Sequence, residues 1–530
     1  MPHPILTRRF SHYFLSGWVV LVLLFSFRTF AAINSATLGS DHAVHILMAY
    51  DFHWPDDLYF WGQNRLGSLL PLVSHLLLKI VPLHPVLVVS YVQYGILLIG
   101  FLAFASLLKQ PISRLIFALV WFMPLGEFSE LLAIGQPYGP QLTCIGVALA
   151  IMNWLMNHPE QPEFKRQFLI TVATLSLWLS LWISDLSLVV LGLLLLAGLG
   201  QLTNQIRRHI DQRNRIRLSL QALGIHRFDL PNIILTSSLG LGFVLYAKAH
   251  ARVVKKYGLF AKPDQIVENI GRLVDAFKNT VSFQVERPFL AVYVLLLLAL
   301  FTYLIYLAFS RQTRFSSTPS RWFYLFLATA IFSFILLVLL YWTYKNPSLR
   351  YYTFVYLFSW MAMLTYIEGF SSAVAPKAYF LLILIIISSS LSLPPRTFFF
   401  NAKASTIQQL EPVQSLGKAG FIGDYWTAYL TCTVNPAQMN CTPYDKKGMS
   451  PCSATPQNQK KFGYVRCPRC IAKTLDSEAI YLIRDGWLDQ FPAEIQQFGQ
   501  CLVKVGAPQK LGLFEMAPYK KRVEQPVSLQ

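Results

Sequence analysis

The chain has 530 residues, of which 54% are hydrophobic and only 13% are charged, and its mean hydropathy is +0.44. Soluble globular proteins carry about 25% charged residues, so this composition excludes a soluble enzyme and indicates a protein surrounded largely by lipid. The formal net charge is +19, but the basic residues lie in short clusters between apolar runs. That distribution follows the positive-inside rule of membrane proteins, and nucleic acid is not an expected partner.

The first apolar run covers residues 14–33 and follows Arg8 and Arg9. We interpret it as a retained membrane helix with a cytoplasmic N-terminus, because it is too long for a secretory signal and lacks a small-residue cleavage pattern. Residues 34–66 then form a first external loop. The short segment 67–83 is expected to lie at the membrane surface or to be half inserted; the alternative is a normal crossing, with another segment miscounted.

Ten further apolar runs predict membrane crossings. They cover residues 85–108, 115–134, 139–156, 168–182, 186–202, 233–249, 289–309, 322–341, 351–370 and 379–393. The basic clusters 207–227 and 311–321 are assigned to the cytoplasm. With the first helix these runs give eleven crossings, a second external loop at 250–288 and an external C-terminus.

The composition changes near Arg396, and the remaining residues are expected to form a second domain. Residues 478–506 have the apolar periodicity of a strand, a helix and a strand, and roughly 130 residues suffice for a small α/β unit. The predicted fold class is therefore an all-α polytopic membrane bundle of about eleven transmembrane helices, residues 1–395, with a C-terminal extracytoplasmic α/β domain, residues 396–530.

Six of the seven cysteines lie in this C-terminal domain, whereas Cys144 lies alone in an apolar run. An even set of cysteines in an external domain predicts up to three disulfides. The alternative is a zinc site, because Cys467 and Cys470 have zinc-knuckle spacing, although no second CxxC motif is present.

The candidate catalytic acids are Asp41, Glu127 and Glu130. Asp41 comes a few residues after the first membrane helix, where a carboxylate is costly unless it is hydrated, paired or functional. Glu127 and Glu130 lie at the external end of the third crossing and are candidates for a second acid or for a metal ligand. No cofactor is required by the sequence, although a divalent metal is possible in principle, and the histidines of the first loop have no metal-site spacing.

Three segments resemble the GT-C superfamily of membrane glycosyltransferases. They are an acid after the first membrane helix followed by "YFWGQNRLGSLLPL", the segment "LRYYTFVYLF" at a late helix, and "GFIGDYWTAYL" in the C-terminal domain. The large external loop at 250–288 adds to the likeness. The superfamily usually carries an Asp-Glu or Glu-Asp pair in the first loop, whereas this chain has Asp41-His42.

The resemblance implies that a sugar moves from a polyprenyl-phosphate-linked donor to a glycan, lipid or protein acceptor at the external face of a bacterial inner membrane. Asp41 is then the expected general base and Arg350 the expected phosphate ligand. The other residues assigned to substrate binding are Tyr351, His42, Gln63, Arg65, Lys255 and Lys256.

Two other functions remain open from the residues alone. A transporter or flippase of a lipid-linked glycan would show inverted repeats and ionisable residues near the membrane midplane. Neither feature is apparent in the sequence. A receptor or scaffold whose C-terminal domain binds a partner would need no acid at Asp41.

Overall fold

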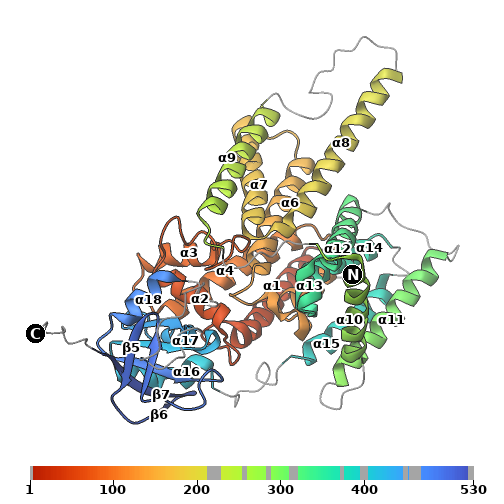
Figure 1. Cartoon of the computed structure of the whole chain (residues 1–530). Helices are drawn as coiled ribbons and strands as arrows, with labels where there is room; N and C mark the ends of the chain where they lie inside the picture. Colours follow the sequence, from red (N-terminus) through yellow and green to blue (C-terminus); the bar gives the residue numbers. More distant parts are fainter. Residues whose placement is uncertain are drawn as a thin grey trace, which may run out of the picture.

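The computed structural model describes residues 4–211, 228–253, 260–281, 288–309, 320–370, 375–393, 404–445, 452 and 467–522. Lys255, Lys256 and most residues of the two basic clusters that were assigned to the cytoplasm lie outside this part of the chain. Helices α1 to α15 form the membrane part, and a sheet with three short helices forms the C-terminal domain (Figure 1).

The bounds of the helices in the membrane part are α1 (Pro4–Phe30), α2 (Ser40–Tyr50), α3 (Leu69–Leu78), α4 (Pro85–Ala105), α5 (Pro111–Phe122), η1 (Gly126–Leu131), α6 (Tyr138–Asn157), α7 (Glu163–Ile183), η2 (Asp185–Ser187), α8 (Leu188–Asp211), α9 (Asp229–His250), α10 (Pro263–Val281), α11 (Pro288–Phe309), α12 (Arg321–Leu339), α13 (Tyr341–Lys345), η4 (Leu349–Tyr352), α14 (Thr353–Ile367) and α15 (Ala375–Leu391).

Five helices of the described chain are long and apolar enough to cross a membrane: α4, α6, α7, α9 and α12. Several other helices contain shorter apolar stretches, such as Phe14–Phe30 in α1, and the total of eleven crossings stays a prediction. Helix α3 has 10 residues, about 15 Å at 1.5 Å per residue, which is half the thickness of a bilayer core. Its length fits the expectation that this segment does not cross.

Residues 115–134, expected to form one membrane-crossing helix, do not form a continuous helix. Helix α5 ends at Phe122, and a separate 3-10 helix, η1, begins at Gly126. Pro124 explains the break, because it lacks an amide proton and pushes the preceding residue out of the helical region; Met123 has φ −134° and ψ 57°. The break brings Glu127 and Glu130 into a short turn rather than the end of a membrane helix.

The helices pack around an aromatic core. Phe104 lies against Phe117, Trp121 and Phe358, with ring centroids 5.8–6.2 Å apart. All four side chains are almost fully buried. Interlocking rings of this size fix how α4, α5 and α14 pack and therefore where their ends lie.

The C-terminal domain has a seven-stranded sheet with the order β2-β1-β3-β7-β5-β4, and β6 pairs with β7. The elements are α16 (Thr406–Leu410), η6 (Glu411–Leu416), β1 (Ala419–Gly423), α17 (Tyr425–Cys432), β2 (Met439–Pro443), α18 (Pro468–Leu475), β3 (Ile480–Arg484), β4 (Glu494–Gln497), β5 (Gln500–Lys504), β6 (Gln509–Leu511) and β7 (Phe514–Lys521). Strands β2, β1 and β3 are parallel and β3 pairs antiparallel with β7, so the domain is mixed α/β.

The helix expected between two strands of residues 478–506 is absent from this described segment. A loop follows β3, contains Gly486 in the left-handed region at φ +65°, and leads into β4. Trp487, Leu488 and Phe491 point from this loop into the core. Their spacing of one and three residues produces an apolar pattern that imitates a helix.

Three disulfides join all six cysteines of the domain: Cys432–Cys441, Cys452–Cys501 and Cys467–Cys470. The disulfide prediction is confirmed, and the zinc alternative for Cys467 and Cys470 is wrong because a disulfide offers no thiolate ligand. Cys144 is buried with a free thiol, as expected for an apolar helix.

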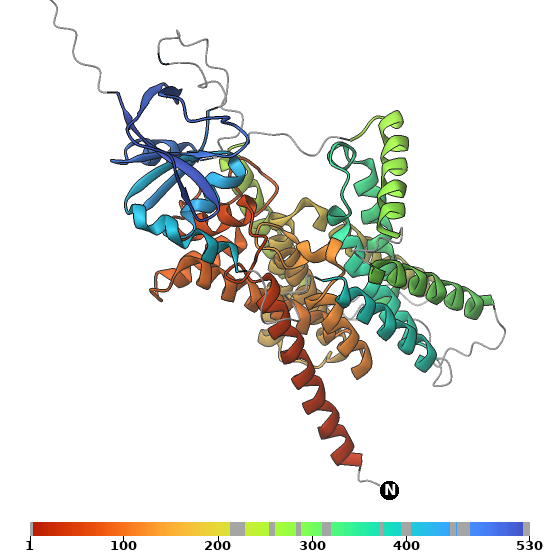
Figure 2. The ribbon, with the colours of Figure 1, turned by 90° about the horizontal axis from the view of Figure 1, so that it is seen from below.

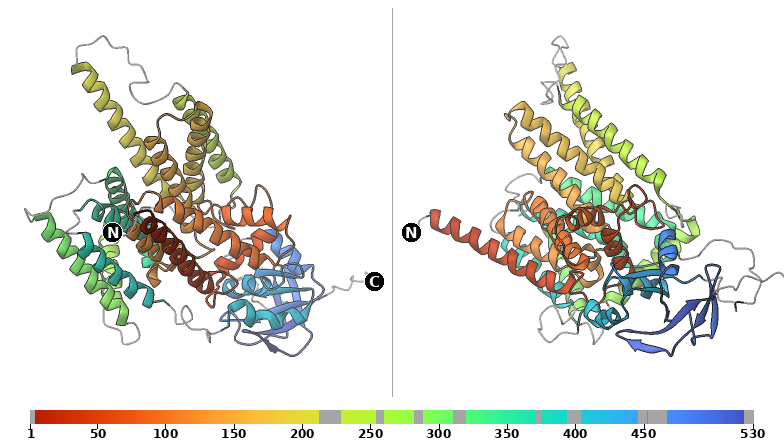
Figure 3. Two further views of the ribbon diagram at one scale, coloured as in Figure 1. Left: turned by 180° about the vertical axis from the view of Figure 1, so that it is seen from behind. Right: turned by 90° about the vertical axis from the view of Figure 1, so that its left-hand side faces the viewer.

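The C-terminal domain docks on the first loop of the membrane part. In Figure 1 the C-terminal domain lies beside α2, which packs against α17, and Figure 2 shows α1 extending away from that domain towards the N-terminus. The side and rear views agree (Figure 3). One continuous apolar cluster contains residues of both parts, including Ala43 and Ile46 of α2 and Tyr429 and Leu430 of α17. Because apolar side chains of both parts are buried in this cluster, their packing sets the orientation of the C-terminal domain on the helices.

Candidate functional site

Asp41 lies in the first turn of α2, the helix that follows α1 in the chain. Its Oδ1 accepts a hydrogen bond of 2.6 Å from the hydroxyl of Tyr425, the first residue of α17 in the C-terminal domain. A phenol donating to a carboxylate at this distance is a strong, charge-assisted hydrogen bond. The C-terminal domain therefore contributes directly to the surroundings of the predicted base.

His42 follows Asp41 in α2. Its Nδ1 accepts a hydrogen bond of 3.0 Å from the backbone N–H of Gly39. Burial lowers the pKa of His42, the charge of Asp41 opposing this only in part, so the imidazole is neutral at neutral pH. Because Nδ1 is the acceptor, Nε2 carries the proton and is the group that can donate a hydrogen bond.

His45 and Gly135 fix the position of Asp41. Burial lowers the pKa of His45 to about 4, so this side chain is neutral, and its Nδ1 bonds the carbonyl oxygen of Ile134. The next residue, Gly135, lies against the backbone of Asp41: a Cβ there would be 2.7 Å from the carbonyl carbon of Asp41. Only glycine allows this approach without displacement.

Glu130 and Arg350 form an ion pair beside Asp41. The guanidinium Nη1 of Arg350, in η4, lies 3.7 Å from Oε1 of Glu130, in η1. Burial raises the pKa of Glu130; the charge of Arg350 lowers it and the charge of Asp41 raises it. Glu130 is therefore within electrostatic range of both Arg350 and Asp41.

Two further side chains complete the arrangement. Tyr138, at the start of α6, is within electrostatic range of Glu130, Arg350 and Arg65. The guanidinium of Arg65 lies 5.7 Å from the ring centroid of Trp342 in α13. We name Asp41, Arg65, Glu130, Tyr138, Arg350 and Tyr425 the Asp41 cluster.

The Asp41 cluster lies at one end of the helix bundle. Its residues occur just after α1, before or at the start of α6, and before α14. The opposite end of α14 has its own polar contacts, which are not part of the cluster: Glu368 accepts hydrogen bonds from the backbone N–H groups of Lys109 and Gln110. The cluster thus combines two carboxylates with two guanidinium groups where apolar helices meet polar loops.

The other predicted site residues have different positions. Tyr351 accepts a hydrogen bond of 3.1 Å from Arg350, so it adjoins the cluster. Glu127 lies in η1 three residues before Glu130, on the same face of a 3-10 helix, and its catalytic role stays a prediction. Gln63 instead lines a separate recess between the domains.

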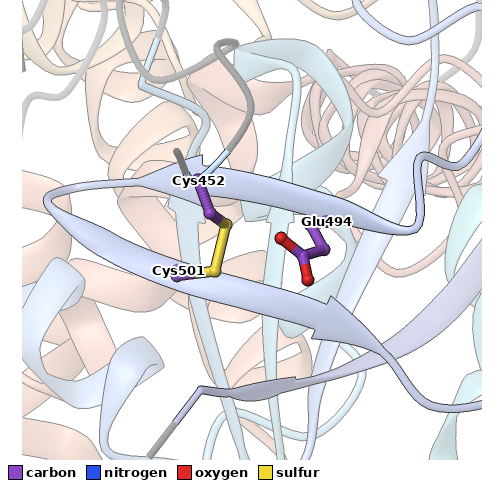
Figure 4. Close-up of side chains that lie close together, drawn as sticks. All are labelled: Cys452, Glu494 and Cys501. Atoms are coloured by element: carbon purple, nitrogen blue, oxygen red, sulfur yellow. A yellow bond between two sulfur atoms is a disulfide. The ribbon is translucent and has the colours of Figure 1, made fainter. Parts of the chain in front are cut away.

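Among the described residues, Glu127 and Glu130, the candidate metal ligands, do not belong to any compact group of metal-binding side chains. The single compact group of three metal-type side chains found there is Cys452, Glu494 and Cys501, in the C-terminal domain (Figure 4). Its two cysteines form a disulfide, and Glu494 forms an ion pair with Arg522. This group therefore fits a structural role and not a metal centre.

No known protein-family model matches the chain, and no curated protein sequence matches it. Sequence reasoning identified Asp41, Glu130 and Arg350 separately, and the structure pairs Glu130 with Arg350 and brings it within electrostatic range of Asp41. It missed Tyr425, His45 and Gly135 as members of the site. The signals available for them were the "GFIGDYWTAYL" segment, the histidine one turn after Asp41, and the glycine in "GQPYGP".

Proposed function

We propose that this protein is a GT-C-like membrane glycosyltransferase that moves a sugar from a polyprenyl-phosphate-linked donor to a cell-envelope acceptor. The observation that carries the proposal is the Asp41 cluster. It combines a carboxylate suited to deprotonate a hydroxyl with guanidinium groups suited to a phosphate, at one end of an apolar bundle.

The reaction assigns one role to each side of the cluster. The hydroxyl oxygen of the acceptor attacks the anomeric carbon of the donor sugar, and Asp41 accepts the proton of that hydroxyl. The bond from the anomeric carbon to the phosphate oxygen breaks, and its electron pair leaves with the polyprenyl phosphate. Arg350 stabilises the charge that develops on that phosphate, since its planar guanidinium can donate two parallel hydrogen bonds.

Glu130 and Tyr425 act as positioning residues in this proposal. The ion pair with Glu130 holds the guanidinium of Arg350 at the cluster before the donor arrives. The hydrogen bond from Tyr425 holds the carboxylate of Asp41 in one orientation. Such preorganisation lowers the reorganisation needed during the reaction.

We further propose eleven crossings in a bacterial inner membrane, with the C-terminal domain on the external side. Three disulfides in that domain support this location, because disulfides form and persist in oxidising compartments. The direct contact of Tyr425 with Asp41 supports one further point: the first loop and the C-terminal domain lie on the same side of the membrane.

The test compares cells that lack the protein with cells that express either the wild type or Asp41→Asn. In cells without the protein and in cells with Asp41→Asn, mass spectrometry should show envelope glycans that lack one sugar residue, and lipid extracts should show accumulation of the sugar-linked carrier. Expression of the wild type should restore both. A flippase would give a different result, because the carrier would accumulate on the cytoplasmic leaflet and Asp41→Asn would restore the glycan. Unchanged glycans in all strains would refute the proposal.

A further inference from the structure

A second recess, which we name the domain pocket, lies between the two parts of the protein. It has a volume of about 100 Å³ and is lined by Trp61 and Gln63 of the first loop, by Arg252 after α9, and by residues from Cys467 to Arg469 at the start of α18. Each water occupies roughly 30 Å³ in the liquid, so the enclosed part of the pocket holds about three waters. That is room for part of one sugar residue.

The charged groups of the domain pocket are already paired. Arg252 forms an ion pair of 3.1 Å with Asp56. The buried carboxylate of Asp57 accepts hydrogen bonds from the indole Nε1 of Trp61 at 2.9 Å and from the guanidinium of Arg469. Arg252 and Asp56 are 3.1 Å apart, closer than the 3.7 Å between Arg350 and Glu130, so an ionic ligand would have to displace a tighter partner here than at the Asp41 cluster.

The remaining groups of the domain pocket suit hydroxyls. The amide of Gln63 donates and accepts hydrogen bonds, as a sugar hydroxyl does. Guanidinium groups paired with a carboxylate keep further N–H donors, since each has five. The ring of Trp61, covered by Arg469 at 5.6 Å, gives the recess a rigid aromatic wall. A neutral, hydroxyl-rich ligand matches these walls better than an anion or an apolar molecule.

A small hairpin joins the domain pocket to the Asp41 cluster. Tyr59 and Gly67 form a bridge at its base, and the backbone N–H of Phe60 donates to the carbonyl of Leu66 at 2.8 Å. Gln63 lines the pocket, whereas Arg65 belongs to the cluster. The Cα atoms of these two residues are at most about 7 Å apart, so the hairpin connects the lining of the pocket to the cluster.

A row of rings follows the same path on the other side. The ring of Trp61 lies 5.6 Å from that of Tyr429, which lies 5.8 Å from that of Tyr425, the partner of Asp41. The pocket and the predicted base are therefore connected by packed, rigid side chains.

We propose that the domain pocket binds one neutral sugar residue of a glycan acceptor and so presents the next part of that acceptor to Asp41. The acceptor role rests on the proposed function, whereas sugar binding by the pocket does not. Seating a remote part of a substrate is an effective way to position the reacting hydroxyl.

The experiment measures binding of neutral sugars to the purified full-length protein in lipid nanodiscs. The probes are glucose, galactose, mannose, N-acetylglucosamine and their disaccharides, with glucuronate as a charged comparator. Saturation-transfer NMR detects binding, and titration gives Kd. We expect at least one neutral probe to bind, glucuronate to bind more weakly, and Gln63→Ala and Arg252→Ala each to raise Kd about tenfold or more, the loss of about one hydrogen bond to a charged or polar group.

Arg484→Ala is the matched control for Arg252→Ala. Arg484 also forms an exposed ion pair of 3.1 Å, with Glu515, but belongs to the sheet and does not line the pocket. It should bind the probe like the wild type, and a thermal melt of each variant separates loss of binding from loss of folding. Gln63→Ala removes no ion pair and keeps the test decisive if Arg252→Ala is unstable.

Two results would overturn the proposal: no binding of any neutral probe, or binding that persists unchanged in both pocket variants. Tighter binding of glucuronate would overturn the assignment of a neutral ligand. Asp41→Asn separates the two proposals, since it should bind the probe normally while transfer is lost. Sugar binding without any transfer by the wild type would leave the pocket assignment standing and refute the proposed function.

Discussion

The close approach of Gly135 to Asp41 gives a prediction whose size follows from the structure. In Gly135→Ala the new Cβ would lie 2.7 Å from the carbonyl carbon of Asp41, whereas ordinary contact begins at 3.4 Å, so one of the two segments must move by about 0.7 Å. Misplacement of a reacting group by about 1 Å can cost about 100-fold in rate. We therefore expect turnover to fall about 10- to 100-fold.

The assay is sugar transfer by reconstituted protein, measured beside a thermal melt. Gly126→Ala is the matched control: it lies in the same connection between α5 and α6, and its Cβ would meet no atom closer than 3.8 Å. Both substitutions restrict the unfolded chain equally, so the comparison isolates the contact with Asp41. Gly135→Ala with wild-type turnover would refute the reasoning that this glycine positions the base.

Three further predictions concern the ion pair and the topology. Arg350→Lys keeps the charge but loses the planar fork, so transfer should fall about 10- to 150-fold, the equivalent of about 1.5–3 kcal/mol; wild-type donor affinity and turnover would contradict a phosphate-binding role. Burial raises the pKa of Glu130, so the folded protein binds this proton more tightly than the unfolded chain does, and stability is lost as pH rises through the raised value. Glutamine does not ionise, so Glu130→Gln escapes that loss. The melting temperature of this variant minus that of the wild type should therefore be larger at about pH 7 than at about pH 4. An equal difference at both pH values would contradict the raised pKa of Glu130. A reporter fused after Leu393 should be active only on the external side, and a cytoplasmic signal would overturn the topology.

The sequence predicted the class of the fold because apolar length and charge patterning act locally. Long runs without breakers became helices, as in α4 and α12. Errors arose where tertiary packing or a single residue overrode the pattern. Pro124 divided one expected crossing into two helices. Trp487 and Phe491 suggested a helix, but they belong to a loop whose apolar side chains pack into the core of the C-terminal domain.

The candidate site shows the same limit. Asp41, Glu130 and Arg350 could be selected from their chemistry and their places beside membrane helices. Tyr425 could not, because its hydrogen bond to Asp41 joins residues 384 positions apart and depends on how the C-terminal domain docks. Gln63 and Arg65 were predicted together from one motif, but the hairpin directs them to different sites.

The identity of the base is the central claim. Asp41→Asn keeps an oxygen that can accept the hydrogen bond from Tyr425 but removes the basicity, so folding and donor binding should persist. Transfer to acceptor in reconstituted membranes should fall about 10²- to 10⁴-fold, the usual contribution of a general base. A normally folded Asp41→Asn protein that transfers sugar at nearly the wild-type rate would contradict the account.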